Sequence, residues 1–98
     1  MYTFIREVTF KTMADAVRAK PIADLISKYY KDTHKVEMRL MRPIGGSPIR
    51  LRFVVEMQSL DAWAAMQTKA IQDPAFQKLL GEIGPTVDGG KTYDEIWQ

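Results

Sequence analysis

The stretch YTFIREVTF (residues 2–10) and the stretch LRFVVEMQ (residues 51–58) decide how this chain folds. Both are rich in β-branched and aromatic residues, which is typical of β-strands. Each leads directly into a helical pattern, and each helical pattern is followed by another strand-like run, at residues 36–42 and 92–97. The sequence therefore predicts the order strand, helix, strand twice over.

Both helical patterns begin at residues that cap helices well. Thr12 precedes Asp15 by three positions, as in a capping box, and Ser59 precedes the second pattern. We expect the first helix to end near residues 32–34 and to kink or restart at Pro21, because proline cannot donate a backbone N–H. The apolar stripe predicted for this helix consists of Met13, Ala16, Val17, Ile22, Leu25, Ile26 and Tyr29.

The second helical pattern is divided at Asp73-Pro74. Because Asp is a good cap and proline is favoured at the first helical position, a separate short helix is predicted to begin here and to stop at Gly84-Pro85. Residues 43–48 place two prolines around a glycine pair, which predicts a loop joining two antiparallel strands. The residues expected to be buried along these helices are Leu60, Trp63, Ala64, Met66, Ala70, Ile71, Phe76, Leu79, Leu80 and Ile83.

Two right-handed βαβ units joined by a hairpin predict a ferredoxin-like α+β sandwich, a βαββαβ arrangement that forms one domain over residues 1–98. Its antiparallel four-stranded sheet has strands one and three at the centre and both helices on one face. Because side chains alternate along a strand, a mainly apolar set should meet the helices: Phe4, Val8, Phe10, Leu51, Phe53, Val55 and Met57. The opposite set is mixed: Ile5, Glu7, Thr9, Arg52, Val54, Glu56 and Gln58.

This mixed face predicts a homodimer that forms through the sheet. A face left in water would carry more polar residues, and a face inside a core would lack the charges. The other interpretation is an uncovered sheet on which Glu7, Arg52 and Glu56 form exposed pairs across strands.

Composition and charge limit the class of protein. The 98 residues carry a net charge of +2, too small a surplus to attract nucleic acid or an anionic membrane. The absence of cysteine excludes disulfides, thiolate metal sites and a cysteine nucleophile. Because the N-terminal residues do not resemble a signal peptide and no apolar run approaches the roughly 20 residues of a membrane span, we expect a cytoplasmic protein.

The element order, the length, the stretch DPAFQKLL (residues 73–80) and the closing YDEIW (residues 93–97) together resemble the dimeric α+β-barrel superfamily, and within it NIPSNAP-type domains. The resemblance implies a dimer whose two sheets face each other, with a small-molecule pocket between sheet and helices. Relatives include antibiotic-biosynthesis monooxygenases, haem-degrading oxygenases, lactone isomerases, polyketide cyclases and many proteins with no known activity, so it leaves open whether this chain is an enzyme.

The resemblance also implies chemistry without a dedicated cofactor. Cofactor-free oxygenases of this superfamily commonly place a strand asparagine beside a tryptophan, and this chain contains no asparagine. This departure counts against an oxygenase. The histidine and tryptophan pattern of the haem-degrading relatives has no counterpart either. We therefore expect no cofactor and no metal site, and a pocket that binds or transforms a small apolar or acidic molecule.

Arg6 is the first candidate for a site residue, because it is in phase with Phe4 and Val8 and should enter the layer between sheet and helices. Its planar guanidinium suits a carboxylate or an enolate-like ligand. A structural ion pair with an acidic residue or a helix C-terminus is the alternative.

His34 is the only histidine, and therefore the only side chain whose ordinary pKa suits proton transfer near neutrality. Its position at the end of a helix also fits a surface or capping role. The remaining candidates are Tyr29, Tyr30, Trp63 and Trp97, because tyrosine can donate to a developing oxyanion and tryptophan can shape an apolar pocket. Of these, Tyr29 and Trp63, together with Phe53, are expected to line the pocket, although Trp63 at helical spacing also fits the core.

Two other classes of protein remain as alternatives. A structural or regulatory dimer without chemistry fits the missing catalytic set. An RNA-recognition module shares the element order, but it needs glycines and exposed aromatic residues on strands one and three, and Phe53 is predicted to face the helices.

Overall fold

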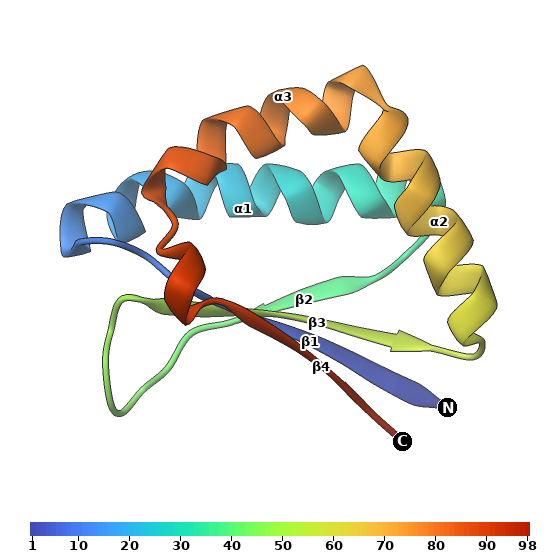
Figure 1. Ribbon diagram of the computed structural model, residues 1–98, viewed down its shortest axis with the longest axis horizontal. Coiled ribbons are helices and arrows are strands. Elements are labelled where there is room, and N and C mark those ends of the chain that lie inside the picture. Colours follow the sequence, from blue (N-terminus) through green and yellow to red (C-terminus); the bar gives the residue numbers. More distant parts are fainter.

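The computed structural model describes residues 1–98 and has the predicted order of elements (Figure 1). The strands are β1 (Tyr2–Thr9), β2 (Met38–Met41), β3 (Arg50–Met57) and β4 (Tyr93–Trp97). The helices are α1 (Met13–His34), α2 (Leu60–Gln72) and α3 (Pro74–Ile83), followed by the short 3-10 turns η1 (Gly84–Thr86) and η2 (Gly89–Lys91). No helix combines the length and the hydrophobicity that crossing a bilayer requires.

The four strands form one antiparallel sheet in the order β2-β3-β1-β4. Strands β1 and β3 are therefore central, and the helices all lie on one face of the sheet (Figure 1). This arrangement is the ferredoxin-like α+β fold that the sequence predicts.

The predicted helix caps are confirmed, because each capping side chain accepts a hydrogen bond from a backbone N–H of its first turn. Thr12 Oγ1 lies 3.1 Å from the nitrogen of Asp15, and Ser59 Oγ lies 3.2 Å from that of Ala62. Asp73 caps the separate helix α3, whose first residue is Pro74. Local capping chemistry thus sets where all three helices begin.

Of the two outcomes predicted at Pro21, a kink or a restart, the restart is wrong, because a single helix runs from Met13 to His34 through this proline. Ala19 and Ala23, on either side of Pro21, are both fully buried. Packing on both sides of Pro21 holds the helix together although one backbone hydrogen bond is missing.

The apolar stripe predicted for α1 is only partly correct. Met13, Val17 and Leu25 are exposed, with 66% of Val17 open to solvent. The residues that are buried follow spacings of four and three positions and include two of the four alanines of the helix. They are Ala19, Ala23, Ile26, Tyr29 and Tyr30. The alanines allow the helix to lie close to its neighbours, so the buried face is rotated from the one that hydrophobicity alone indicates.

In the other helices, Trp63, Ala70, Phe76 and Ile83 are buried as predicted. Four other predicted core residues, Leu60, Ala64, Ile71 and Leu80, are exposed, and Met66 and Leu79 are partly buried. The inward-facing strand residues from Phe4 to Met57 that were predicted to meet the helices are all buried.

The outer face of the two central strands carries no aromatic side chain. Phe4 and Phe53 pack beneath the helices instead. An RNA-recognition module stacks bases on aromatic residues of this outer face. The surface that such a module would use is therefore built differently here.

Candidate functional site

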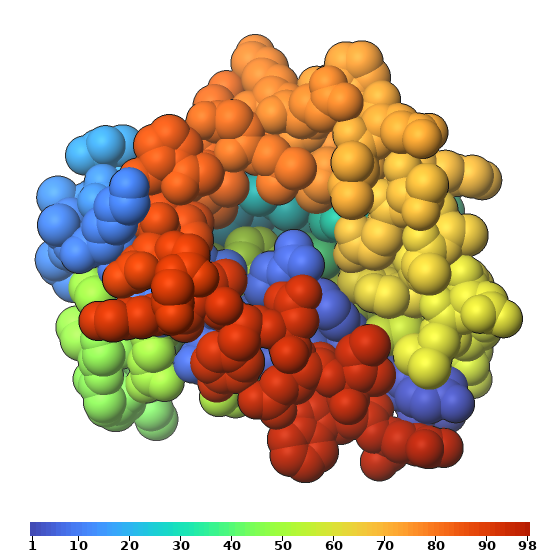
Figure 2. All heavy atoms as spheres, in the orientation of Figure 1, coloured from blue at the N-terminus to red at the C-terminus, as the bar shows by residue number.

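A cavity of about 570 Å³ opens between the sheet and the helices. Figure 2 shows the hollow framed by α3 above, α2 on one side and the segment from η2 to β4 below, with atoms of α1 and β1 visible at its floor. Eleven of its seventeen lining residues are hydrophobic, among them Phe4, Ile26, Met38, Phe53 and Phe76. A concave site of this size with few polar groups has the general character of a small-molecule pocket.

Arg6 and Asp94 form an ion pair in the wall of this cavity. They are direct partners in the register of β1 and β4, so the sheet itself places them together. Arg6 Nε lies 2.7 Å from Asp94 Oδ1, and Nη2 lies 2.9 Å from Oδ2. The hydrogen bond to Asp94 raises the pKa of Arg6. The two interpretations of Arg6 are thus compatible, because it lines the cavity and is also paired.

The Arg6–Asp94 pair is only half covered. The side chain of Arg6 is 41% exposed, and that of Asp94 is 44% exposed. The guanidinium carbon also lies 5.5 Å from the centre of the Phe4 ring, within reach of a cation–π contact. A molecule in the cavity could therefore touch both an aromatic ring and a charged pair.

Tyr30 is the one polar side chain that α1 contributes to the cavity. Its hydroxyl donates to Gln67 Oε1 over 3.3 Å, and burial raises the pKa of Tyr30. The sequence predicts its neighbour, Tyr29, for the cavity lining and offers Tyr30 as a further candidate. Tyr30 follows the buried Ile26 by four positions, so helical periodicity carried a signal for it.

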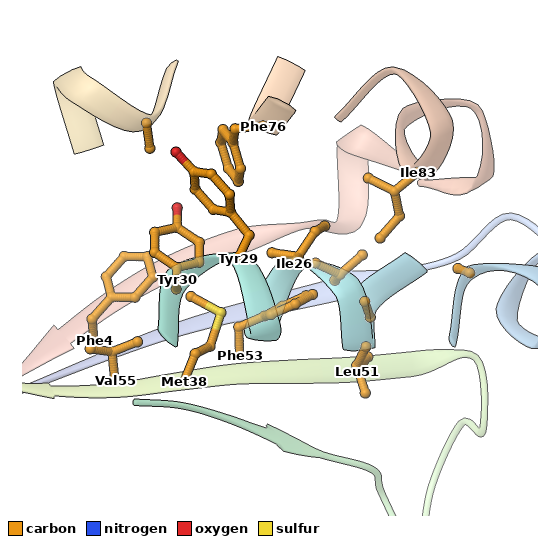
Figure 3. Close-up of a cluster of buried hydrophobic side chains, with 14 of the residues drawn as sticks. Phe4, Ile26, Tyr29, Tyr30, Met38, Leu51, Phe53, Val55, Phe76 and Ile83 are labelled. Atoms are coloured by element: carbon orange, nitrogen blue, oxygen red, sulfur yellow. The ribbon is translucent and has the colours of Figure 1, made fainter. Parts of the chain in front are cut away.

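Tyr29 points instead into a corner made by the end of α1 and the start of α3. Its ring stacks on Phe76, with ring centres 5.2 Å apart (Figure 3). Its hydroxyl lies 2.7 Å from Asp73 Oδ2 and 3.1 Å from His34 Nε2. Because the hydroxyl gives its single hydrogen to the carboxylate, His34 Nε2 must be the donor to the hydroxyl oxygen.

The electrostatics of this corner follow from burial and from that hydrogen bond. Burial, followed by the bond to Asp73, raises the pKa of Tyr29 to about 12. The same bond lowers the pKa of Asp73. Tyr29 therefore stays protonated and Asp73 stays ionised over the neutral range. The corner is thus a stable hydrogen-bonded link between α1 and α3.

The structure separates the five candidate residues. Arg6 and Phe53 line the cavity, whereas Tyr29 and His34 meet each other outside it. Trp63 packs behind the cavity wall, 4.8 Å from the Phe4 ring, and is not part of the lining. Nowhere do three His, Asp or Glu side chains gather as they would around a metal ion.

Glu7 organises the opposite face of the sheet. Its side chain is only 9% exposed and accepts hydrogen bonds from Arg52 Nε at 2.8 Å and from the Tyr93 hydroxyl at 3.0 Å. Arg50 Nη1 lies 3.5 Å away. The bond from Arg52 is the main cause of a lowered pKa at Glu7. The carboxylate on this face is therefore fully paired within the chain.

Comparison with known proteins identifies the fold and no activity. No protein-family model matches the chain, and no curated protein matches it. Among solved structures, a NIPSNAP family protein with unknown function from Agrobacterium tumefaciens is similar with a TM-score of 0.85 at 17% identity, over 100% of this chain and 92% of the other. A NIPSNAP domain protein from Burkholderia xenovorans has a TM-score of 0.82 at 15% identity, over 100% and 93% of the two chains.

A third similar structure is a variant of SnoaB, a cofactor-independent oxygenase from Streptomyces nogalater. Its TM-score is 0.72 at 10% identity, over 99% of this chain and 90% of that chain. The resemblance to NIPSNAP domains and to monooxygenase-like barrels is thereby confirmed for the fold. Identities this low say nothing about shared chemistry.

Proposed function

We propose that this protein binds a small, largely apolar molecule in the cavity between its sheet and its helices. The observation that carries the proposal is a cavity of about 570 Å³ with mainly hydrophobic walls and a half-exposed ion pair, Arg6 and Asp94, on one side. Apolar walls supply affinity, and the few polar groups orient the ligand. Phe53 belongs to these walls, and Arg6 is the group that contacts a polar part of the ligand.

Any reaction in this cavity would use the reactivity of the bound molecule and no dedicated cofactor. The protein would supply hydrogen-bond donors for a developing oxyanion, namely Arg6 and the hydroxyl of Tyr30, whose single hydrogen would turn from Gln67 Oε1 to the ligand. His34 lies in the corner with Tyr29, outside the cavity lining, and is not placed to transfer a proton there.

The alternative is binding without chemistry, as in a sensor or carrier. It is favoured by the pairing of the two charged cavity residues, because Arg6 and Asp94 are hydrogen-bonded to each other and neither is left free as an acid or base. Turnover of a molecule that copurifies with the protein would support the enzyme, and its recovery unchanged would support the carrier.

A neutral fluorescent probe tests the cavity directly. Gly84 lines the cavity, and a side-chain carbon added there meets no atom within 4 Å. The Cβ of a side chain at Gly84 therefore lies in open space, and Gly84→Leu should fill part of the cavity. N-phenyl-1-naphthylamine should bind the wild type saturably with one site per chain and bind Gly84→Leu at least about tenfold more weakly, a loss of about 1.4 kcal/mol.

The matched control is Gly81→Leu. Gly81 is also in open space but is not part of the cavity lining, so its replacement should leave probe binding unchanged. Equal probe binding by Gly84→Leu and the wild type would contradict the proposed site.

We further propose that the protein is a homodimer formed through the outer face of the sheet. Ile5 and Val54 lie opposite each other at its centre, and the exposed side chains of Tyr93 and Trp97 belong to the same face. The one buried charge there, Glu7, already has its partners, so a second subunit can cover it without leaving an unpaired charge.

Sedimentation velocity tests the dimer. Ile5→Lys places a charge in the middle of the proposed interface and should convert the protein to monomers. Val17→Lys makes the same change on the helical side, where Val17 is exposed, and should leave the dimer intact. A wild type that sediments as a monomer at micromolar concentration would disprove this interface.

A further inference from the structure

The Arg6–Asp94 pair gives the cavity a net charge of zero. These two residues are the only charged ones in the lining. Asp94 takes two parallel hydrogen bonds, from Nε and Nη2 of Arg6, in the geometry that a bound carboxylate would otherwise adopt. Asp94 thus already occupies the edge of the guanidinium that is best suited to a carboxylate ligand.

The pair still offers hydrogen-bonding groups to a ligand. Two of the five N–H donors of Arg6 bond to Asp94, which leaves three free, two of them on Nη1. Each oxygen of Asp94 accepts one bond from Arg6 and retains a second lone pair. Because both side chains are more than 40% exposed, these groups are accessible from the cavity.

A charged ligand and an uncharged one meet this pair differently. A carboxylate would bring a second negative charge close to Asp94 while sharing a cation that is already neutralised. An amide, ketone or enol would accept from Nη1 without that repulsion, and its own N–H or O–H would have an acceptor in Asp94.

Resting on the proposed function, we infer that Asp94 determines specificity: by occupying Arg6, it makes the cavity select uncharged carbonyl- or hydroxyl-bearing molecules over carboxylates. Arg6 is then one half of a neutral recognition element. The sequence predicts an apolar or acidic ligand, and the Arg6–Asp94 pair narrows that prediction to uncharged molecules.

Two probes of equal shape test this inference, namely 2-naphthamide and 2-naphthoate, which is an anion near neutral pH. Dissociation constants measured from the NMR chemical shifts of backbone N–H groups should show that the wild type binds 2-naphthamide more tightly than 2-naphthoate. Asp94→Asn frees the charge of Arg6, so the ratio of the two constants should shift toward naphthoate by at least about tenfold, the equivalent of about 1.4 kcal/mol.

The matched control is Glu95→Gln. Glu95 is the next residue of β4, faces the other side of the sheet and bonds to Trp97 Nε1 at 2.7 Å. Its replacement removes the same charge and should leave the ratio unchanged. If Asp94→Asn does not fold, Asp94→Thr removes the charge with a residue suited to an edge strand.

The outcomes separate this inference from the proposed function. A wild type that prefers naphthoate, or a folded Asp94 variant with an unchanged ratio, overturns the role of Asp94 while leaving the cavity as a binding site. If neither probe binds the folded wild type, the proposed function falls, and the inference falls with it.

Discussion

Arg6 and Glu7 are adjacent on β1, yet their ion pairs have opposite characters. Arg6 faces the helices, and its pair with Asp94 is half open to a cavity. Glu7 faces the other way, and its carboxylate is 9% exposed beneath three donors. Alternation along one strand therefore places an accessible pair on one side of the sheet and a closed network on the other.

The difference in exposure indicates a difference in role. A solvent-accessible pair adds little to stability, because water competes for both partners. A covered carboxylate with several donors contributes more, and its loss leaves those donors unpaired. The Arg6 side therefore suits ligand recognition, and the Glu7 side suits a permanent interface.

Replacing Glu7 or Asp94 by alanine should give the largest difference in the free energy of unfolding. Glu7→Ala should lower the free energy of unfolding by about 2 kcal/mol, because Arg52 and Tyr93 lose a charged acceptor. Asp94→Ala removes the same charge and should cost less than about 1 kcal/mol. Urea denaturation at one fixed chain concentration measures both. Equal losses would contradict the assignment of different roles.

The pH dependence of Glu7 sharpens the same contrast. Its pKa is lowered in the folded state, from an ordinary value of 4.5, so its contribution is complete above that value and is lost as the pH falls through the lowered pKa. The wild type should exceed Glu7→Gln in stability at neutral pH, and the difference should shrink in acid. A difference independent of pH would show that the charge of Glu7 is not responsible.

Tyr29 and Tyr30 form a second pair of neighbours with different surroundings. Tyr29→Phe breaks the bridge between His34 and Asp73 and should cost about 1 kcal/mol. Because the pKa of Tyr29 is raised to about 12, its contribution is complete below pH 10 and is lost as the pH rises from 10 to 12. The free energy of unfolding of Tyr29→Phe should therefore depend less on pH than that of the wild type in this range. An unchanged pH dependence would contradict the hydrogen-bonded link between α1 and α3.

Tyr30→Phe should have the smallest effect on stability, about 0.5 kcal/mol, since its bond to Gln67 is long at 3.3 Å. Its effect should appear in the cavity instead, as weaker binding of 2-naphthamide with little change for N-phenyl-1-naphthylamine, which has no carbonyl. If both probes lose affinity equally, Tyr30 shapes the wall and does not donate to the ligand.

Most of the fold could be predicted from the sequence because its signals are local. The caps Thr12, Ser59 and Asp73 fixed where the helices begin, and strand alternation assigned Arg6 and Phe53 to the inner face. Prediction failed where tertiary packing outweighs local preference. Pro21 lies inside a continuous helix because the residues on both sides of it are buried.

The site was less accessible to sequence reasoning because its partners are distant in the chain. Asp94 lies 88 positions from Arg6, and only the register of β4 on β1 brings them together. The choice between Tyr29 and Tyr30 depends on the rotation of α1, which Ala19 and Ala23 set through close packing. A stripe drawn from large hydrophobic residues points to Tyr29 and misses Tyr30.

Native mass spectrometry of gently purified protein reports on both faces of the sheet in one spectrum. We expect a dimer that carries extra mass from a small molecule, and a dimer of Gly84→Leu without that mass. A monomer at the bare chain mass, with Gly84→Leu indistinguishable from the wild type, would contradict both the closed outer face and the open cavity.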